Sequence, residues 1–429
     1  MNELIEIQEL LDSPFPQQNH FHLPLNKLRT FVDVTWKIPA YQTAESKKVM
    51  PLYMQELNDF NPDGRFSKNI FPGSNPFFRH VKFLQYLIAR ENGVVVGRIA
   101  VYIDSRYKDH HVHGDIGWIG SFECIESKYV AEKLINTAIT LLKEQKVTKI
   151  IGPARFNANG EVGITISGFD HHPMIMEPYT PSYYQEYFES LGTKENDWYA
   201  FHIESREVST YVERIAQIRR SGMSLEDKMT ADKIIIRPVK LKNLKQEAKK
   251  IQYVYNTAWN TLEHPQFAPL TDEEFKSLVS ALVLLAVEDL ILIVEDHSKE
   301  GHQVVGMSVL LPDINETIEL YDQKHPGFRP TQGMLGLIKS LIRDARIYIQ
   351  VKKMIRRHSF QGARMIILGT IIKKTGLDAL LYLKSYENSR KFGIEFGSGS
   401  QIADTNLEMV NPLLRLGTKS LCWRIYKFL

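Results

Sequence analysis

The chain has 429 residues, of which 43% are hydrophobic and 24% charged, a composition typical of folded globular proteins rather than disordered ones. Its formal net charge of +3 is too small for the concentrated basic face of a nucleic-acid-binding protein, so we expect no nucleic-acid partner. Two cysteines are too few for a disulfide framework or a zinc knuckle.

No targeting or membrane-spanning segment is expected. The amino-terminal residues lack the basic and apolar regions of a secretion signal. The most apolar run, 279–294, is interrupted by Glu288 and Asp289, whereas a membrane-spanning helix needs about 20 apolar residues. We therefore expect a cytoplasmic protein.

From about residue 28 to residue 205, the hydrophobic pattern predicts alternating strands and helices. The expected strands are 31–38, 83–89, 94–103, 116–125, 149–152 and 198–203, and the expected helices are 45–58, 128–145 and 182–191. Asn92 and Gly93 tolerate the positive φ angles of a tight turn, so 83–89 and 94–103 should form a hairpin.

After a charged segment with one short helix, 204–233, the same order of elements begins again. The strands expected there are 234–239, 290–295, 304–311, 364–370, 394–396 and 420–428, and the helices are 244–259, 271–287, 376–392 and 407–416. The repeated order predicts an α/β fold with a mixed sheet in each half. We expect an N-terminal domain at 1–210, a linker at 211–233, and a C-terminal domain at 234–429 with an insertion at 327–360.

Short motifs in a fixed order carry a family resemblance over most of the chain. They include NPFF at 75–78, GRIA at 97–100, SFEC at 121–124, PMIMEPY at 173–179, YNTAW at 255–259, LPDIN at 311–315 and GLDAL at 376–380. The chain resembles bacterial proteins built from two GNAT domains, the fold of acyl-CoA N-acyltransferases, and bacterial ceramide synthases are similar. The resemblance implies two tandem GNAT-like domains, acyl-CoA as co-substrate, no metal, and acyl transfer to a small amine. A long-chain amino alcohol or another lipid-like amine is the candidate acceptor.

In GNAT proteins the pyrophosphate of acyl-CoA binds backbone amides in a turn with the consensus R/Q-x-x-G-x-G/A, where a helix N-terminus favours the anion. In the second half, the turn keeps Gly376, has Lys373 for the usual Arg or Gln, and has Asp378 for the last small residue. The candidate cofactor-binding residues are Thr370, Ile372, Lys373, Lys374, Thr375, Gly376, Leu377, Asp378 and Ala379. A plain strand-to-helix turn is the alternative. The corresponding first-half turn, 123–126, has two acids and no glycine, so we expect no conventional CoA site there.

GNAT chemistry also needs a base for the amine, for which Glu123 is the candidate, while Glu161 and His172 are candidate catalytic residues through contact with the substrate. Glu123 ends a strand where such a carboxylate is expected, although an ordinary strand-end carboxylate also fits. Glu161 and His172 lie in the glycine-rich segment 152–179, and loops often carry function, although a solvated turn explains the histidine too.

The tyrosine that serves as acid in GNAT proteins is replaced here by Phe188 and Leu413. Tyr184 remains a candidate acid on the first of these helices, although its spacing from Phe188 also fits core packing. The string His110-His111-Val-His113-Gly-Asp115 resembles a motif of a different acyltransferase superfamily, but a GNAT-like strand follows it, so we interpret it as coincidence and expect no metal site.

The insertion at 327–360 combines basic and apolar residues. The basic ones are Lys339, Arg343, Arg346, Lys352, Lys353, Arg356, Arg357 and His358. A basic amphipathic helix is a candidate for peripheral contact with the inner face of the membrane, and the alternative is a helix that packs its apolar side on the core. The alternative to an enzyme is a catalytically silent module that holds a lipid or a protein. The missing tyrosine and the imperfect cofactor turn favour that module, whereas Gly376 and the segment 160–179 favour the N-acyltransferase.

Overall fold

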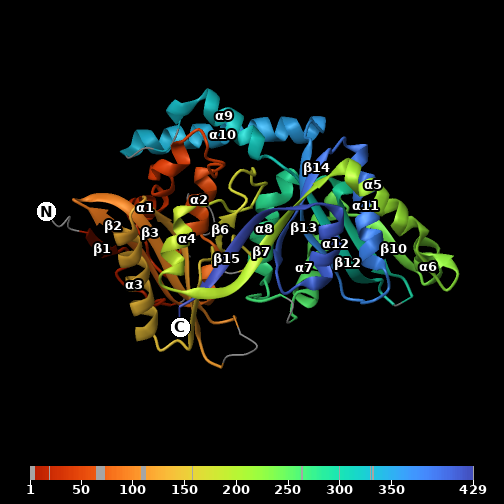
Figure 1. Cartoon of the computed structure of the whole chain (residues 1–429), viewed down its shortest axis with the longest axis horizontal. Helices are drawn as coiled ribbons and strands as arrows, with labels where there is room; N and C mark the ends of the chain where they lie inside the picture. The colour runs from red at the N-terminus through yellow and green to blue at the C-terminus, as the bar shows by residue number, and fades with distance from the viewer. Residues whose placement is uncertain are drawn as a thin grey trace.

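The computed structural model describes residues 5–18, 20–63, 73–107, 113–156, 158–261, 264–298, 300–328, 330 and 333–428. Within these ranges, strands from both halves of the chain form one continuous sheet (Figure 1). Its strands are β1 Ile5–Glu9, β2 Val81–Glu91, β3 Val94–Asp104, β4 Ile116–Cys124, β5 Lys149–Gly152, β6 Ile164–Ser167, β7 Thr193–Glu204, β10 Ile234–Pro238, β11 Ile291–Asp296, β12 Gln303–Pro312, β13 Gly362–Thr370, β14 Phe396–Ala403 and β15 Thr418–Lys427. A separate small hairpin contains β8 Arg219–Arg220 and β9 Met223–Ser224.

Helices cover both faces of this sheet. They are α1 Leu25–Val32, α2 Tyr53–Phe60, α3 Lys128–Glu144, α4 Tyr183–Glu189, α5 Ser205–Gln217, α6 Leu225–Ala231, α7 Leu244–Ala258, α8 Asp272–Leu282, α9 Asn315–Lys324, α10 Gly333–Arg357, α11 Leu377–Lys391 and α12 Leu407–Leu416. Alternation along β2 sends Tyr86 into the core beneath α1 and α2, and Leu87 into the core beneath α3. In the second half, Ile293 packs with α7 on one face and Val294 with α11 on the other.

The strand order is β1-β2-β3-β4-β5-β15-β7-β14-β13-β12-β11-β10, with β6 paired to β15 outside this path. Neighbouring strands are antiparallel except for β4 with β5 and β13 with β14, which are parallel. Each half therefore contributes an antiparallel meander that ends in one parallel pair. The strand order thus confirms the expected mixed sheet, with the same arrangement in both halves.

The halves also exchange their last strands. The chain's final strand, β15, lies between β5 and β7, with Tyr426 opposite Gly152 and Trp423 opposite Trp198. The first half's last strand, β7, pairs on its other side with β14, where Ile203 faces Gly397. Each parallel pair is therefore extended by a strand from the other half. The domain boundaries at 1–210, 211–233 and 234–429 stay a prediction.

Most predicted elements agree with the structure, and the turn between β2 and β3 has the expected positive φ angles at Asn92 (49°) and Gly93 (82°). The strand predicted at 31–38 is wrong, because this segment contains the end of α1 and the 3-10 helix η1 Thr35–Lys37. Leu28, Phe31 and Val32 share one face of α1 and are buried, so helical packing overrides the alternating pattern. The predicted helix at 45–58 begins only at Tyr53.

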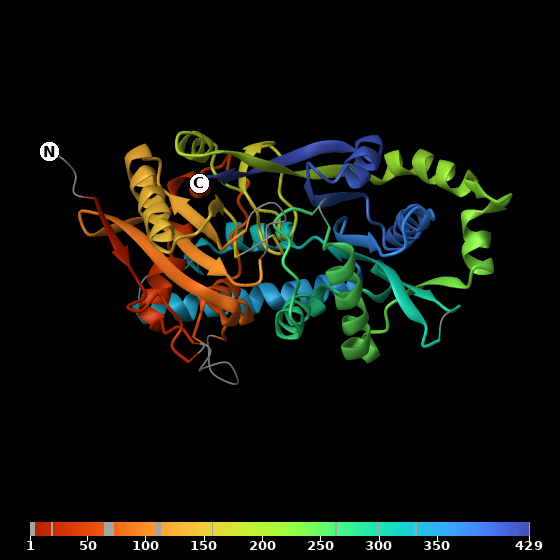
Figure 2. The ribbon, with the colours of Figure 1, turned by 90° about the horizontal axis from the view of Figure 1, so that it is seen from below.

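The insertion folds mainly into α10, which has 25 residues. Figure 2 shows α10 along one side of the molecule, reaching from the first half into the second. Its Arg343 donates hydrogen bonds to the backbone oxygens of Met50 (3.1 Å) and Pro51 (3.0 Å), so the insertion is tied to the segment before α2. Among the described residues, no helix is long and apolar enough to cross a membrane.

Candidate active site

A cavity of about 670 Å³ has walls from both halves of the chain. Its apolar end lies where β13 and β14 separate. These strands are paired from Gly362 to Met365 and from Phe396 to Gly399, and beyond this register they diverge. Ile366, Leu368 and Ile402 line the opening between them. A gap between two parallel strands, lined by apolar side chains, can hold an elongated ligand between the edges of the sheet.

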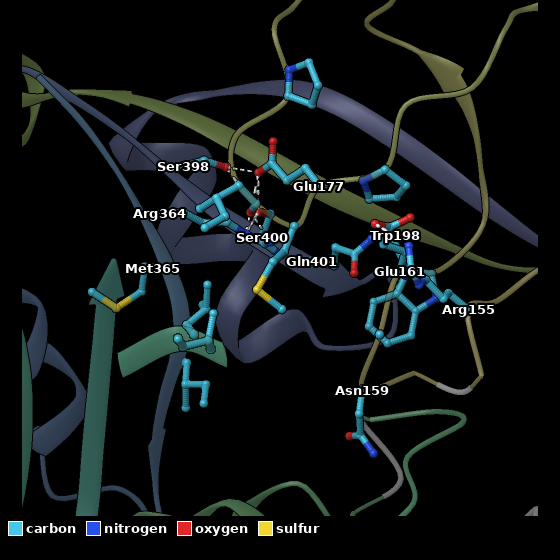
Figure 3. Close-up of a pocket in the computed structure, with 18 of the residues that line it drawn as sticks. Arg155, Asn159, Glu161, Glu177, Trp198, Arg364, Met365, Ser398, Ser400 and Gln401 are labelled. Carbon is cyan, nitrogen blue, oxygen red and sulfur yellow. Dashed lines mark hydrogen bonds and ion pairs between the residues drawn. The ribbon is translucent and has the colours of Figure 1, made fainter. Parts of the chain in front are cut away.

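A buried polar group lies at the centre of the cavity wall (Figure 3). Ser398 donates a hydrogen bond to Glu177 Oε1 (2.5 Å), and Ser400 donates another to the same oxygen. Arg364 Nε donates to Ser400 Oγ (2.8 Å) and lies 3.8 Å from Glu177 Oε1. Burial lowers the pKa of Arg364 from its usual value. The arrangement neutralises one buried carboxylate with one guanidinium and two hydroxyls.

The sequence did not single out this group, although Glu177 belongs to the PMIMEPY motif of the segment 152–179. That segment crosses from the first half to the second. Asp313 accepts the backbone N–H of Ile175 (2.9 Å), and Asn315 Nδ2 donates to the carbonyl of Pro173 (2.7 Å). Burial raises the pKa of Asp313 to about 6. These contacts hold Glu177 against β14.

The structure brings Glu123 and Tyr184 together. Glu123 Oε2 accepts hydrogen bonds from the hydroxyls of Tyr41 (2.8 Å) and Tyr184 (3.1 Å), and Arg98 Nη2 lies 4.0 Å from Glu123 Oε1. Burial, and next the neighbouring Glu123, raise the pKa of Tyr184 well above its usual value. Glu123 also lines the cavity, whereas Tyr184 lies behind it in the core. Their catalytic roles stay predictions.

Glu161 and His172 lie in different environments. Glu161 lines the cavity, with 37% of its side chain exposed, and Arg155 Nη1 lies 3.8 Å from its Oε1. His172 is 61% exposed, is not among the residues that line the cavity, and has its Nδ1 3.8 Å from Glu319 Oε1. Burial, and then Lys47, lower the pKa of His172. The two residues are not brought to one site, and their catalytic roles stay predictions.

The predicted cofactor turn joins β13 to α11. Lys374 (φ 60°) and Gly376 (φ 86°) adopt left-handed conformations, and Gly376 caps the helix. A Cβ atom at position 376 would lie 2.9 Å from Leu225 Cδ2 of α6, so this glycine also permits close packing of the linker. Lys373 Nζ lies 3.3 Å from Glu408 Oε2.

The remaining residues of the turn extend from Thr370, at the end of β13, to Ala379 in the first turn of α11. Thr375 Oγ1 accepts the N–H of Leu377 (3.4 Å), while the amides of Asp378 and Ala379 have no acceptor among the described residues. The turn itself is not part of the cavity wall, which reaches Leu368 before it and Tyr382 after it.

The histidine string falls partly outside the described residues, which contain neither His110 nor His111. Asp115 at its end accepts hydrogen bonds from Lys82 Nζ (2.7 and 3.0 Å). Within the ranges that the structure describes, no group of histidine, cysteine and acidic side chains has the geometry of a metal site.

No family model matches the chain. It is 27% identical over 346 residues to Protein YghO of Escherichia coli (strain K12), covering 80% of this chain and 81% of that protein. It is 26% identical over 284 residues to the bacterial ceramide synthase of Caulobacter vibrioides (strain NA1000 / CB15N), covering 66% of this chain and 67% of that protein.

Among solved structures, the chain is similar to a GCN5-related glucosamine N-acetyltransferase region in a fungal multi-domain GH3 beta-N-acetylglucosaminidase. The TM-score is 0.50 at 10% identity, and the match covers 100% of this chain and 38% of that one, so this chain spans less than half of that protein's length. At this identity the likeness concerns the fold alone. The chain therefore has a tandem GNAT fold, as expected, and the predicted similarity to bacterial ceramide synthases is confirmed.

Proposed function

We propose that this tandem GNAT chain is an acyl-CoA-dependent N-acyltransferase whose acceptor is a lipid-like amine. The observation that carries the proposal is one continuous cavity, which extends from the apolar gap between β13 and β14 to charged residues of the first half. Acyl transfer needs both environments, because an acyl chain is apolar whereas a primary amine, with a pKa of about 10.4, arrives as a cation.

The turn at Lys373–Ala379 is the proposed site for the pyrophosphate of the acyl-CoA substrate. The open amides of Asp378 and Ala379 and the charge of Lys373 and Lys374 suit an anion. The carboxylate of Asp378 repels such an anion, and Leu225 restricts the space above Gly376. From this turn the pantetheine and acyl chain would follow the gap between β13 and β14.

Within the cavity, Gln401 is a candidate donor to the thioester carbonyl. It lies on β14 just beyond the point where β13 separates, and its buried Nε2 has no partner among the described residues. In the proposed reaction the amine nitrogen forms a bond to the thioester carbon, the carbon–sulfur bond breaks, and sulfur leaves with the electron pair. Starting from the ammonium, nitrogen loses two protons: one passes to a wall carboxylate such as Glu161 before the attack, and one ends on the sulfur of the released CoA thiol.

A thermal-shift experiment with acetyl-CoA, palmitoyl-CoA and free CoA tests this function. Tight binding should stabilise the protein by about 2.7 kcal/mol at a hundredfold excess over the dissociation constant. Charge reversal at Lys373 and Lys374 should reduce the shift, whereas reversal at the exposed Lys245 and Lys249 of α7 should leave it unchanged. Mass spectrometry of palmitoyl-CoA with a long-chain amino alcohol should then detect the amide.

Absence of any shift with all three compounds would contradict the enzyme and favour the silent GNAT-fold module that holds a lipid or a protein. The specific observations behind that second candidate are the acid at Asp378 and the absence of a tyrosine at Phe188 and Leu413.

We also infer peripheral contact with an anionic membrane through α10. Its inward face buries Leu337, Ile347 and Val351, but a second apolar stripe faces outward. The outward residues and their exposed fractions are Met334 (68%), Leu335 (76%), Ile338 (46%), Ile342 (38%) and Ile349 (50%). The alternative, a helix that packs its apolar side on the core, accounts for the inward face but not for this outward stripe.

Exposed basic residues border this stripe. They are Lys339, Arg346, Lys352, Lys353, Arg356 and Arg357. Each lysine or arginine near an anionic bilayer contributes about 1 kcal/mol of attraction. Arg343 takes no part, because it is buried in ion pairs with Asp322 (2.7 Å) and Asp344 (3.0 Å). Tyr348, which is 48% exposed, also lines the cavity, so the cavity reaches the surface beside this face.

A further inference from the structure

The cavity wall contributed by the first half contains one arginine surrounded by three acids. Arg155 Nη1 lies 2.6 Å from Glu56 Oε1, and Arg155 Nη2 lies 2.8 Å from Asp59 Oδ2. Glu161 Oε1 lies 3.8 Å from Arg155 Nη1. Glu56 and Asp59 are three positions apart in α2, so they project from one face of that helix toward the arginine. The ring of Phe60, whose centroid lies 4.7 Å from Arg155 Cζ, stacks against the guanidinium.

This wall has more negative charge than the arginine can neutralise. The guanidinium offers one positive charge to three carboxylates. Glu56 is fully enclosed, with 2% of its side chain exposed, and its contact of 2.6 Å with Arg155 satisfies it. Asp59 and Glu161 keep 32% and 37% of their side chains exposed, and both line the cavity. Two carboxylates therefore face the cavity with incomplete compensation, which favours a cation there.

A buried donor without a partner lies on the same wall. Trp198 of β7 is 7% exposed and lines the cavity, and its Nε1 has no acceptor among the described residues. Figure 3 shows Trp198 next to Glu161 and Arg155. A buried indole N–H usually has an acceptor, because leaving it unpaired costs about 1–3 kcal/mol. This N–H therefore indicates an oxygen atom of a ligand beside the acidic group.

We propose that Asp59 and Glu161 bind the ammonium group of the acceptor, and that Trp198 Nε1 donates a hydrogen bond to an oxygen next to that group. This subsite rests on the proposed function for its role in acyl transfer, and it narrows the acceptor class. A cation with an adjacent hydroxyl fits both partners, so the acceptor is an amino alcohol rather than a simple alkylamine. Asp59 also takes one proton from the ammonium, which leaves the lone pair on nitrogen.

The titration of Asp59 agrees with this role. Burial raises the pKa of Asp59 to about 6, Arg155 opposes the shift, and Glu56 and Glu161 add to it. These three side chains are the charged groups that act most strongly on Asp59. Above about pH 6 the carboxylate is ionised and attracts the ammonium, which keeps its protons until acyl transfer begins. Below that pH Asp59 becomes neutral, so affinity for the cation should fall.

The test measures binding of a twelve-carbon amino alcohol by calorimetry without acyl-CoA, with the corresponding neutral diol as the comparison ligand. We expect the Asp59→Asn, Glu161→Gln double variant to weaken amino alcohol binding at least tenfold and to leave diol binding unchanged. Trp198→Phe should weaken both ligands by a smaller factor. Asp12→Asn, which changes an exposed aspartate elsewhere in the same half, is the control and should bind like the unmodified protein. A melting curve for each variant verifies folding.

The possible outcomes distinguish a failure of the proposed subsite from a failure of the proposed transferase activity. Equal affinity of the double variant and the unmodified protein, or no binding of the amino alcohol, would overturn the subsite even if acyl-CoA binds. Amino alcohol binding that depends on Asp59 in a protein that binds no acyl-CoA would support the subsite and contradict the transferase. If the double variant does not fold, the pH dependence decides. Binding by the unmodified protein should weaken between pH 7.5 and pH 5, and a flat profile would overturn the role of Asp59.

Discussion

Gly376 combines two restraints at one residue. Its φ of 86° is costly for an L-residue, about 1–2 kcal/mol, and its Cα faces Leu225 of α6. Gly376→Val should therefore shift the cofactor turn and weaken CoA binding at least tenfold, measured by calorimetry. Gly301→Val is the matched control, because Gly301 also has a positive φ (81°) but no neighbour within 4 Å. Equal CoA affinity in both variants would contradict a cofactor site at this turn.

Glu177 is a second residue whose contribution to the free energy of unfolding depends on its buried environment. It accepts hydrogen bonds from Ser398, Ser400 and the backbone of Met174, with Arg364 nearby. Removing one member of a buried charged group leaves the other uncompensated, so Glu177→Gln should lower the free energy of unfolding by about 3 kcal/mol, measured with urea.

The exposed pair of Lys128 and Glu186 provides the comparison for Glu177. Its nitrogen and oxygen lie 2.9 Å apart, but the two side chains are 47% and 68% exposed. Solvent screens such an exposed pair, so Glu186→Gln should leave the free energy of unfolding close to that of the unmodified protein. A similar loss in both variants would show that burial does not strengthen the group at Glu177.

At the scale of single elements, α10 has two apolar faces, of which one is buried. If the outer face contacts a membrane, Leu335→Glu with Ile338→Glu should abolish sedimentation with vesicles that contain phosphatidylserine. Neutral phosphatidylcholine vesicles should bind weakly even before the substitution, because the flanking lysines and arginines need anionic lipid.

Val94→Glu is the control for α10. Val94 is 64% exposed on the hairpin between β2 and β3, far along the chain from the insertion, and its replacement should leave sedimentation unchanged. Binding that persists in the α10 variant, or that is lost equally in the control, would contradict a membrane-facing role for this helix.

At the scale of the whole molecule, the strand exchange makes the two halves depend on each other. Removing residues 418–429 deletes β15, which lies between β5 and β7 of the first half. Hydrogen exchange should therefore lose protection in β5 and β7, far from the deletion in sequence. Removing residues 1–9 deletes only the edge strand β1 and should leave both strands protected. Protection of β5 in the first truncation would show that the halves fold independently.

The sequence predicts an element of this fold well when the pattern that indicates it lies within a few neighbouring residues. The hairpin at Asn92-Gly93, the helix α3 and the strand β5 follow from patterns within a few residues, and all three agree with the structure. The strand predicted at 31–38 is wrong, because an alternating pattern over eight residues also fits a short helix with a buried face. Local periodicity cannot distinguish these cases without the packing partner.

In the candidate site, too, local patterns predict single residues but not which residues meet. The glycine-rich loop predicts a functional role for Glu161, but no local pattern joins this residue to Asp59 or Trp198, which meet it only through the cavity. Likewise, Glu177 meets Ser398 and Ser400 only because β14 pairs with β7 beside the crossing loop.

The sequence by itself determined the elements, their repeated order and the resemblance to tandem GNAT proteins, since these depend on neighbouring residues and on motif spacing. The tertiary structure alone decided which strands are exchanged, which face of α10 is outward, and which charged side chains share one cavity. Most of these contacts join residues that are far apart in the sequence, and their partners are set by sheet order and by the burial of whole faces.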